Sequence, residues 1–300
     1  MEAIQKKEDI LGNILAYFHQ TKEVVDAKLV MYMENNEPLL EILQESINYT
    51  LYSGGKRVRP LFCFIVGEMF DVPKNKLLSL ACALEMIHTA SLIMDDLPHM
   101  DNAKIRRGKA ANHLIYGQDV AALASIGLLT RAYEVVLNDP DLPHDKKSRV
   151  VSKLANVVGI SGMVGGQFVD LKFSSHSMES STLEYIHTHK TASLFVASGS
   201  TAAIIGDAAE DEIQALETYA KNLGFAFQVL DDLLDATGNV KDVGKSLNND
   251  AGSFVTLFGV SKSKELVKEY TDNAIQAIKK LDRNYEKLVI LAHVLLKRKS

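Results

Sequence analysis

The chain has 300 residues, 47% of them hydrophobic, which is enough apolar material for one large domain or two modest ones. Its formal net charge is -5 at pH 7, and no basic stripe with interleaved aromatic residues is present, so we expect no nucleic acid as a partner. The two cysteines, Cys63 and Cys82, are too few for a disulfide framework or a thiolate zinc site and fit a reducing, cytoplasmic location. No run of about 18 uncharged apolar residues is present, so we expect no stable membrane insertion.

Helical periodicity extends through most of the chain. Apolar residues recur three and four positions apart, for example over 77–87 and 213–223. No alternating strands joined by Asn-Gly or Asp-Gly turns are visible. Breaks between helices are expected near 35–37, 53–57, 71–74, 98–112, 138–145, 173–180, 206–210, 236–260 and 282–285. The sequence predicts an all-α protein of about ten helices in a single domain, 1–300.

The first polar motif in the chain is SGGKRVRP at 53–60. Paired glycines let the backbone approach an anion closely, and Lys56 and Arg59 supply positive charge. The motif is not a Walker A loop, because the second glycine and the Lys-Ser/Thr pair of that pattern are absent. On its own, a helix-start turn with a solvated lysine is the commoner explanation.

A cluster of carboxylates follows the apolar run ASLIM at 90–94. Asp95, Asp96 and Asp101 continue what reads as a core helix, and buried carboxylates need compensating charge, for which hard divalent cations are suited. Asp95 and Asp101 are six apart and would not share a helical face, but Pro98 favours a helix end before it, so that Asp101 can fold back toward Asp95. A solvated helix end is the alternative for one cluster alone.

A second acidic cluster follows the apolar run 225–230. Asp231 and Asp235 are four apart, so one face of a helix presents both, with Asp232 beside them. Cationic residues follow each cluster and lie between the two. They are Arg106, Arg107 and Lys109, then Lys190 beside Thr191, then Lys241 and Lys245. An isolated lysine such as Lys190 could simply extend to solvent, but two carboxylate sets with several cationic sets indicate an enzyme that binds two phosphorylated substrates through Mg²⁺.

Taken in order, these motifs resemble the trans-isoprenyl diphosphate synthase family. The resemblance rests on 54–60, His88, 95–108, GGQFVD at 165–170, Lys190-Thr191 and FQVLDDLLD at 227–235. It extends from about residue 45 to 260 and is closest to the geranylgeranyl diphosphate synthases, whose first motif has two extra residues between the aspartates. It implies a bundle of mostly antiparallel helices around a central cavity, working as a homodimer. The implied reaction is head-to-tail prenyl transfer, which joins an allylic diphosphate (dimethylallyl, geranyl or farnesyl) to isopentenyl diphosphate.

The resemblance also implies roles for individual residues. About three Mg²⁺ ions are expected at Asp95, Asp96, Asp101, Asp231, Asp232 and Asp235. The allylic diphosphate is expected at Arg106, Lys190 and Lys245, and isopentenyl diphosphate at Lys56, Arg59, His88 and Arg107. Thr191 and Gln228 are expected to face the allylic carbon.

Product length is expected to depend on the residues just before Asp95. Ala90 and Ser91 are small and lie one helical turn upstream, so they form no floor for a short product and favour the C20 product, geranylgeranyl diphosphate, over C15. Close packing between helices explains the same small side chains equally well.

One stretch departs from the family pattern. Members usually carry a further lysine and a threonine after the second acidic cluster, whereas loop 246–254 here has no lysine, and Ser246 stands where aspartate is frequent. Lys241 and Ser253 are possible substitutes. Two alternatives therefore stay open, a farnesyl diphosphate (C15) synthase and a non-catalytic regulatory subunit of a synthase, although regulatory subunits typically lose one of the two acidic motifs.

Two further alternatives fit the basic residues less well. A class I terpene cyclase does not bind isopentenyl diphosphate, so it leaves 54–60 without a purpose. A helical metal-binding bundle with no enzymatic role leaves both cationic sets unexplained.

Overall fold

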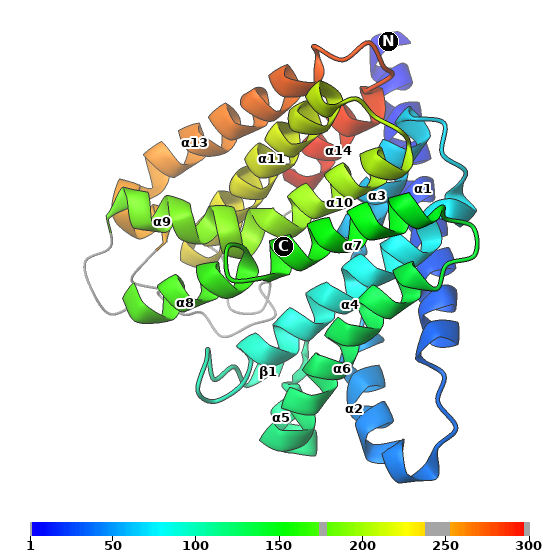
Figure 1. Cartoon of the computed structure of the whole chain (residues 1–300). Coiled ribbons are helices and arrows are strands. Elements are labelled where there is room, and N and C mark those ends of the chain that lie inside the picture. The colour runs from blue at the N-terminus through cyan, green and yellow to red at the C-terminus, as the bar shows by residue number, and fades with distance from the viewer. Residues whose placement is uncertain (1, 174–178, 238–252, 297–300) are drawn as a thin grey trace.

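The computed structural model describes residues 2–173, 179–237 and 253–296, with side chains outside that description at 2–15 and at 237 (Figure 1). Those residues form long helices and one short hairpin, which confirms the predicted all-α class. The α-helices are α1 Glu2–Met33, α2 Glu41–Leu51, α3 Val58–Met69, α4 Leu78–Asp95, α5 Asn112–Tyr116, α6 Gln118–Leu137, α7 His144–Val158, α8 Met163–Phe173, α9 Ser180–Ile186, α10 Ser193–Ile205, α11 Glu210–Thr237, α13 Phe254–Ile278 and α14 Glu286–Leu296. Shorter elements are η1 Pro38–Leu40, η2 Lys74–Leu77, the π-helix η3 His187–Ala192, β1 Ile105–Arg106 and β2 Lys109–Ala110.

Helices α4 and α10 form the centre of the bundle. Helix α4 packs against α1, α3, α6 and α10, and α10 packs against α3, α7 and α11. Both are apolar over most of their surface, as expected for helices with neighbours on several sides. The C-terminal end of α4, the β1–β2 hairpin and α8 lie on the same side of the bundle (Figure 1). The acidic end of α4 is therefore held by a rigid, buried helix.

Most of the predicted breaks are confirmed, and two features were missed. Helices α7 and α8 are separated at 159–162, because a Cβ at Gly162 would lie 1.9 Å from the Val157 carbonyl oxygen, so only glycine allows this turn. Within 98–112 the chain forms the β1–β2 hairpin, whose turn places Arg107 and Gly108 at φ 54° and 74°. Two consecutive residues with positive φ are typical of a type I′ hairpin turn. Strands of two residues are too short to produce an alternating pattern in the sequence.

Three helical stretches of the described chain are long and apolar enough, by length and composition alone, to cross a membrane. They are Lys74–Asp95, Gln118–Leu137 and His144–Phe173. In the first, 72% of the apolar window is buried inside the protein, whereas the shares in the others are 39% and 22%. The run of uncharged residues applied to the sequence was too strict a criterion to detect them, and the absence of stable membrane insertion stays a prediction.

Helix α8 lies very close to η3. A Cβ on Gly166 would lie 2.5 Å from the backbone nitrogen of Lys190 and 2.9 Å from the His189 carbonyl carbon. Backbone atoms cannot move aside as a flexible side chain can. The glycine pair of the GGQFVD motif therefore allows α8 to support the segment that carries Lys190.

We expect Gly166→Ala to force α8 away from η3. The free energy of unfolding should fall by about 1–3 kcal/mol, as for other overpacked sites, and any activity that depends on the position of Lys190 should fall with it. Thermal denaturation and steady-state turnover check this. The matched control is Gly127→Ala in α6, where the nearest atom to an added Cβ, Ile47 Cδ1, is 3.7 Å away. That variant should keep its activity and gain about 0.5–1 kcal/mol of helix stability. Equal behaviour of the two variants would contradict the close contact.

Candidate active site

The first acidic cluster (Asp95, Asp96 and Asp101) lies where α4 ends. The backbone nitrogen of Asp101 donates to the carbonyl oxygen of Asp95 at 2.9 Å, so the predicted return of Asp101 toward Asp95 is confirmed. Burial raises the pKa of Asp95 to about 6, against the opposing effect of the Lys190 ammonium and with a further increase from Asp101. Asp95 is thus a carboxylate whose negative charge the protein compensates only in part.

Asp96 has a different environment from Asp95. It is 1% exposed, and the Nε of Arg106 donates to both of its oxygens at 2.9 and 3.2 Å, with an additional contact from Nη2 to Oδ1. The pair connects the end of α4 to β1 in the hairpin. In this structure Asp96 and Arg106, predicted to bind metal and allylic diphosphate respectively, are engaged with each other.

Lys190 lies in the π-helix η3 and faces the first acidic cluster. Its Nζ donates to Asp170 Oδ2 at 2.7 Å. Burial acts to lower the pKa of Lys190, but Asp95, Asp170 and Asp101 outweigh it, so the pKa is raised and the ammonium stays charged. Single π-helical turns within α-helices occur frequently at functional sites.

The second acidic cluster (Asp231, Asp232 and Asp235) lies on α11, which packs along η3. Thr191 Oγ1 donates to Gln228 Oε1 at 3.3 Å, and Gln228 Nε2 donates to Asp232 Oδ1 at 3.0 Å. The other oxygen of Asp232 accepts from the Phe254 backbone nitrogen at 2.8 Å, at the start of α13. Burial raises the pKa of Asp232 to about 6, with further increases from Asp231 and Asp235.

Consecutive residues of η3 therefore join the two acidic clusters. The ammonium of Lys190 interacts electrostatically with Asp95 and Asp101. Thr191 is hydrogen-bonded to Gln228, which is hydrogen-bonded to Asp232. The structure thus brings Lys190 of η3 near the end of α4 and links Thr191 of η3 to α11, whereas Lys245, also predicted to bind the allylic substrate, lies outside the described residues.

The donor set suits Mg²⁺, a hard cation that prefers carboxylate oxygens. Asp95 and Asp232 are carboxylates with raised pKa values, so each cluster has negative charge to neutralise. Among the residues that the structure describes, no three His, Cys, Asp or Glu side chains form a complete metal-binding group. Mg²⁺ is usually held by one or two carboxylates together with substrate phosphates and water, so the acidic residues fit an ion that arrives with a diphosphate.

The basic cluster (Lys56, Arg59, His88 and Arg107) is formed by the start of α3, the middle of α4 and the hairpin turn. The guanidinium of Arg59 lies 4.8 Å from the ring centroid of Phe195, and its Nε is buried without a hydrogen-bond partner. Burial lowers the pKa of Arg59 to about 10. Burial, together with Arg59 and Arg107, also lowers the pKa of His88 well below its usual range, so the imidazole is neutral at pH 7.

The remaining predicted positions are less decisive. Ala90 is 3% exposed, and its carbonyl oxygen accepts from Ser125 Oγ of α6 at 2.8 Å, while the hydroxyl of Ser91 donates to the His88 carbonyl oxygen at 2.9 Å. Ser253 caps α13, since its Oγ accepts from the Thr256 backbone nitrogen. Lys241, Lys245 and Ser246 lie outside the described residues, as does loop 246–254 up to residue 252.

Sequence reasoning missed the residues that hold the site residues in place. Asp170 binds Lys190, and Arg57 and Glu85 form a buried ion pair with 2.6 Å between Nη1 and Oε1 behind the basic cluster. A signal for Glu85 was present, since it lies one helical turn before His88 in an otherwise apolar helix.

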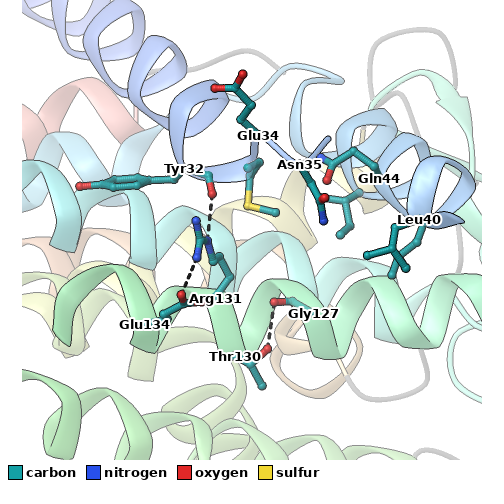
Figure 2. A pocket seen from close by; sticks show the side chains of 12 residues that line it. Tyr32, Glu34, Asn35, Leu40, Gln44, Gly127, Thr130, Arg131 and Glu134 are labelled. Carbon is teal, nitrogen blue, oxygen red and sulfur yellow. Dashed lines mark hydrogen bonds and ion pairs between the residues drawn. The ribbon is translucent and has the colours of Figure 1, made fainter. Parts of the chain in front are cut away.

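A separate pocket of about 260 Å³ lies between the end of α1, α2 and α6 (Figure 2). Its charged residues are Glu34, Arg131 and Glu134, and Arg131 is already bound to Glu134 and to the Tyr32 carbonyl oxygen. None of the predicted site residues lines this pocket.

Comparison with known proteins identifies the family of the chain. The polyprenyl synthetase family model matches residues 40–289. A geranylgeranyl diphosphate synthase of Cyanophora paradoxa is 37% identical over 96% of this chain and 97% of its own length. Geranylgeranyl pyrophosphate synthase 3, chloroplastic, of Arabidopsis thaliana is 41% identical over 84% of this chain and 72% of its own.

Two solved structures are similar over nearly the whole chain. An FPP/GFPP synthase of Zymomonas mobilis superposes with a TM-score of 0.84 at 28% identity and covers 95% of this chain and 98% of its own. A geranyltransferase of Helicobacter pylori, complexed with magnesium and isoprenyl diphosphate, gives 0.83 at 27% identity over 94% and 96%.

Fold and site together define a class of enzyme, the trans-prenyltransferases that lengthen an isoprenoid diphosphate. This chain belongs to the polyprenyl synthetase family.

The raised pKa of Asp95 leads to a prediction on stability. Its carboxyl has a pKa of about 6 in the folded protein and an ordinary value of 3.8, so the native state binds the proton more tightly. Ionisation of Asp95 therefore destabilises the metal-free protein as pH rises from about 4 to about 6. Asp95→Asn removes this effect and should be about 1–3 kcal/mol more stable than wild type at pH 7, with no difference near pH 4.

Thermal denaturation in EDTA across this pH range measures the difference. A variant no more stable than wild type at pH 7 would contradict the buried, partly compensated carboxylate.

Proposed function

We propose that this enzyme condenses an allylic diphosphate with isopentenyl diphosphate to give geranylgeranyl diphosphate, the C20 product, with about three Mg²⁺ ions. The observation that carries the proposal is the position of η3. Lys190 faces the first acidic cluster, and Thr191 is bonded through Gln228 to the second. A diphosphate between the clusters would meet carboxylate-bound metal on two sides and the ammonium of Lys190 on a third.

Each residue contributes to one step of the reaction. Mg²⁺, when bound, supplies positive charge that stabilises the leaving diphosphate as the allylic C–O bond breaks. Lys190 stabilises the same negative charge. The Thr191 hydroxyl donates a hydrogen bond to Gln228 Oε1, and Gln228 Nε2 donates one to Asp232. The lone pairs of Thr191 Oγ1 and the remaining lone pair of Gln228 Oε1 are thus available to stabilise positive charge on the allylic carbon.

The second substrate is held by the basic cluster. Arg59 and Arg107 orient the diphosphate of isopentenyl diphosphate, and its double bond then attacks the allylic cation and forms the new C–C bond. Loss of a proton to the departing pyrophosphate restores a double bond in a product longer by five carbons. The apolar helices α4 and α10 exclude water, which would otherwise react with the cation.

The homodimer is part of the proposal. Helices α5 and α6 expose large apolar side chains that the rest of the described chain does not cover. Leu114, Ile115, Leu123 and Ile126 are each about half exposed, at 48%, 53%, 57% and 53%. Contiguous exposed apolar residues mark interaction surfaces, and a second copy of the chain is the partner we propose for this one.

A cytoplasmic location also remains a proposal. It rests on the reduced cysteines Cys63 and Cys82, which are both free and buried. The Arabidopsis thaliana relative is chloroplastic.

We expect the purified chain to release pyrophosphate from geranyl or farnesyl diphosphate with isopentenyl diphosphate when Mg²⁺ is present, and to stop when EDTA is added. Lys190→Met should lower turnover by at least about 100-fold, the usual effect of removing one group that stabilises developing charge. Lys153→Met is the matched control, since Lys153 pairs with Glu217 away from the site. A pyrophosphate assay and chromatography of the products provide both readouts.

The outcomes separate the alternatives. A product that stops at C15 would identify a farnesyl diphosphate synthase. Absence of turnover in a folded wild-type protein would support the regulatory subunit, and turnover that Lys190→Met leaves unchanged would contradict the proposed site.

Ala90→Tyr should shorten the product, because a phenol side chain at this buried position places a floor one turn before Asp95. The change fills space, so about 1–3 kcal/mol of stability should also be lost. Chromatography of the products measures chain length, and turnover of dimethylallyl diphosphate by the same variant serves as the control for folding. An active variant that still makes the C20 product would refute the role of Ala90 as a length determinant.

A further inference from the structure

A buried carboxylate lies behind the basic cluster. Glu85, on α4, is 2% exposed, and its Oε1 is 2.6 Å from Nη1 of Arg57 and 3.7 Å from Nη2 of Arg107. Glu85 also acts on Arg59: burial lowers the pKa of Arg59, and the negative charge of Glu85 raises it in part. Two guanidinium groups, one at the N-cap of α3 and one in the hairpin turn, therefore lie within 4 Å of one acidic side chain, and its charge also acts on Arg59.

Arg57 uses its donors within the protein. Besides Glu85, it donates from Nε to Asp26 Oδ1 at 2.7 Å and from Nη2 to the Leu51 carbonyl oxygen at 2.8 Å. Its backbone has a φ of 48°, a left-handed conformation that non-glycine residues adopt rarely and that places Arg57 at the N-cap of α3. These contacts hold the turn between Lys56 and Arg59 in one conformation and leave Arg57 itself unsuited to bind a ligand.

Arg59 and Arg107, by contrast, retain hydrogen-bonding capacity. Within the part of the chain that the structure describes, the Nε of Arg59 is buried without a partner, and the contacts of Arg107 are long, at 3.3 Å to the Thr50 carbonyl oxygen and 3.7 Å to Glu85. A Cβ on Gly55 would lie 3.2 Å from Nη2 of Arg107, so the glycine turn also lies directly beside this guanidinium. Unused donors on two adjacent guanidinium groups match the oxygens of a diphosphate.

We propose that Glu85 is a positioning residue for isopentenyl diphosphate. Its carboxylate fixes Arg57, and with it the 54–59 turn, and directs Arg107, so that Arg59 and Arg107 present their remaining donors to one diphosphate. This inference rests on the proposed function, because it assigns the second substrate to the basic cluster.

Two effects of removing the charge of Glu85 oppose each other. Loss of a negative charge would by itself strengthen the attraction of the site for an anion. Loss of the partner at 2.6 Å releases Arg57 and the turn that it holds. We expect the loss of positioning to outweigh the gain in attraction, because removing one partner of a buried ion pair disturbs the arrangement of every group that the pair holds.

Glu85→Gln is the test of this inference. We expect the KM for isopentenyl diphosphate to rise about tenfold, which corresponds to about 1.4 kcal/mol, while the KM for the allylic diphosphate and kcat stay within about twofold. Arg57→Lys is the second variant. It keeps the net charge of the site but loses the fork that joins Asp26, Glu85 and Leu51, so a similar rise in this KM would result from geometry alone. Glu68→Gln is the matched control, because this carboxylate of α3 interacts with Lys287 and Tyr17 and with no residue of the basic cluster, and we expect it to leave the same KM within about twofold.

Calorimetric titration with isopentenyl diphosphate alone measures its dissociation constant at the basic cluster in the absence of catalysis. If wild type binds isopentenyl diphosphate and Glu85→Gln binds it more weakly, the positioning role is supported even when no turnover occurs. Failure of the positioning role can therefore be distinguished from failure of the proposed function. Unchanged or tighter binding by Glu85→Gln, or equal increases in both KM values, would overturn it. Should Glu85→Gln not fold, unchanged binding by Arg57→Lys would overturn it in the same way.

Discussion

The site depends on one partly buried cation, the ammonium of Lys190. Asp170 pairs with it at 2.7 Å, Asp95 and Asp101 add to the attraction, and together they outweigh the burial that disfavours its charge. An ammonium that is largely removed from water is unfavourable unless it is paired, and so is the carboxylate of Asp95, whose pKa burial raises. Each therefore stabilises the others. The π-helical turn of η3 serves this pairing, because it directs Lys190 toward α4 while the next residue, Thr191, is bonded to α11.

Each acidic cluster contains two consecutive aspartates, and the second of them is hydrogen-bonded to another part of the chain. Asp96 is held by Arg106, and Asp232 accepts from Gln228 and from the backbone of Phe254. The two contacts fix the elements that follow each pair, the β1–β2 hairpin in one case and the start of α13 in the other. For Asp95 the charge of Lys190 opposes the effect of burial only in part, and its pKa stays raised to about 6. Asp96 and Asp232 would therefore hold the neighbouring acidic residues in place before a metal–diphosphate group binds to them.

The sequence predicted the helical class and the motifs because both depend on local patterns. The apolar period marked the helices, and Pro98 correctly indicated that Asp101 returns toward Asp95. What it could not predict depends on distant contacts or on single residues. Arg57 meets Asp26 and Glu85, which are 31 and 28 positions away. The π-turn at 187–192 shifts the helical register by one residue, and no pattern in the composition marks it. The turn at 159–162 depends on space that only the fold defines.

Helix α4 also sets the spacing between the two sites proposed for the substrates. His88 and Asp95 are seven residues apart, so they share one face and are separated by about 10 Å along the axis. One residue of the basic cluster and one of the first acidic cluster therefore lie on the same largely buried helix, which fixes their separation. Ser91 lies between them on that face, and its hydroxyl donates to the His88 carbonyl oxygen. That bond directs the hydroxyl hydrogen of Ser91 back toward the backbone of α4 and fixes this side chain between His88 and Asp95.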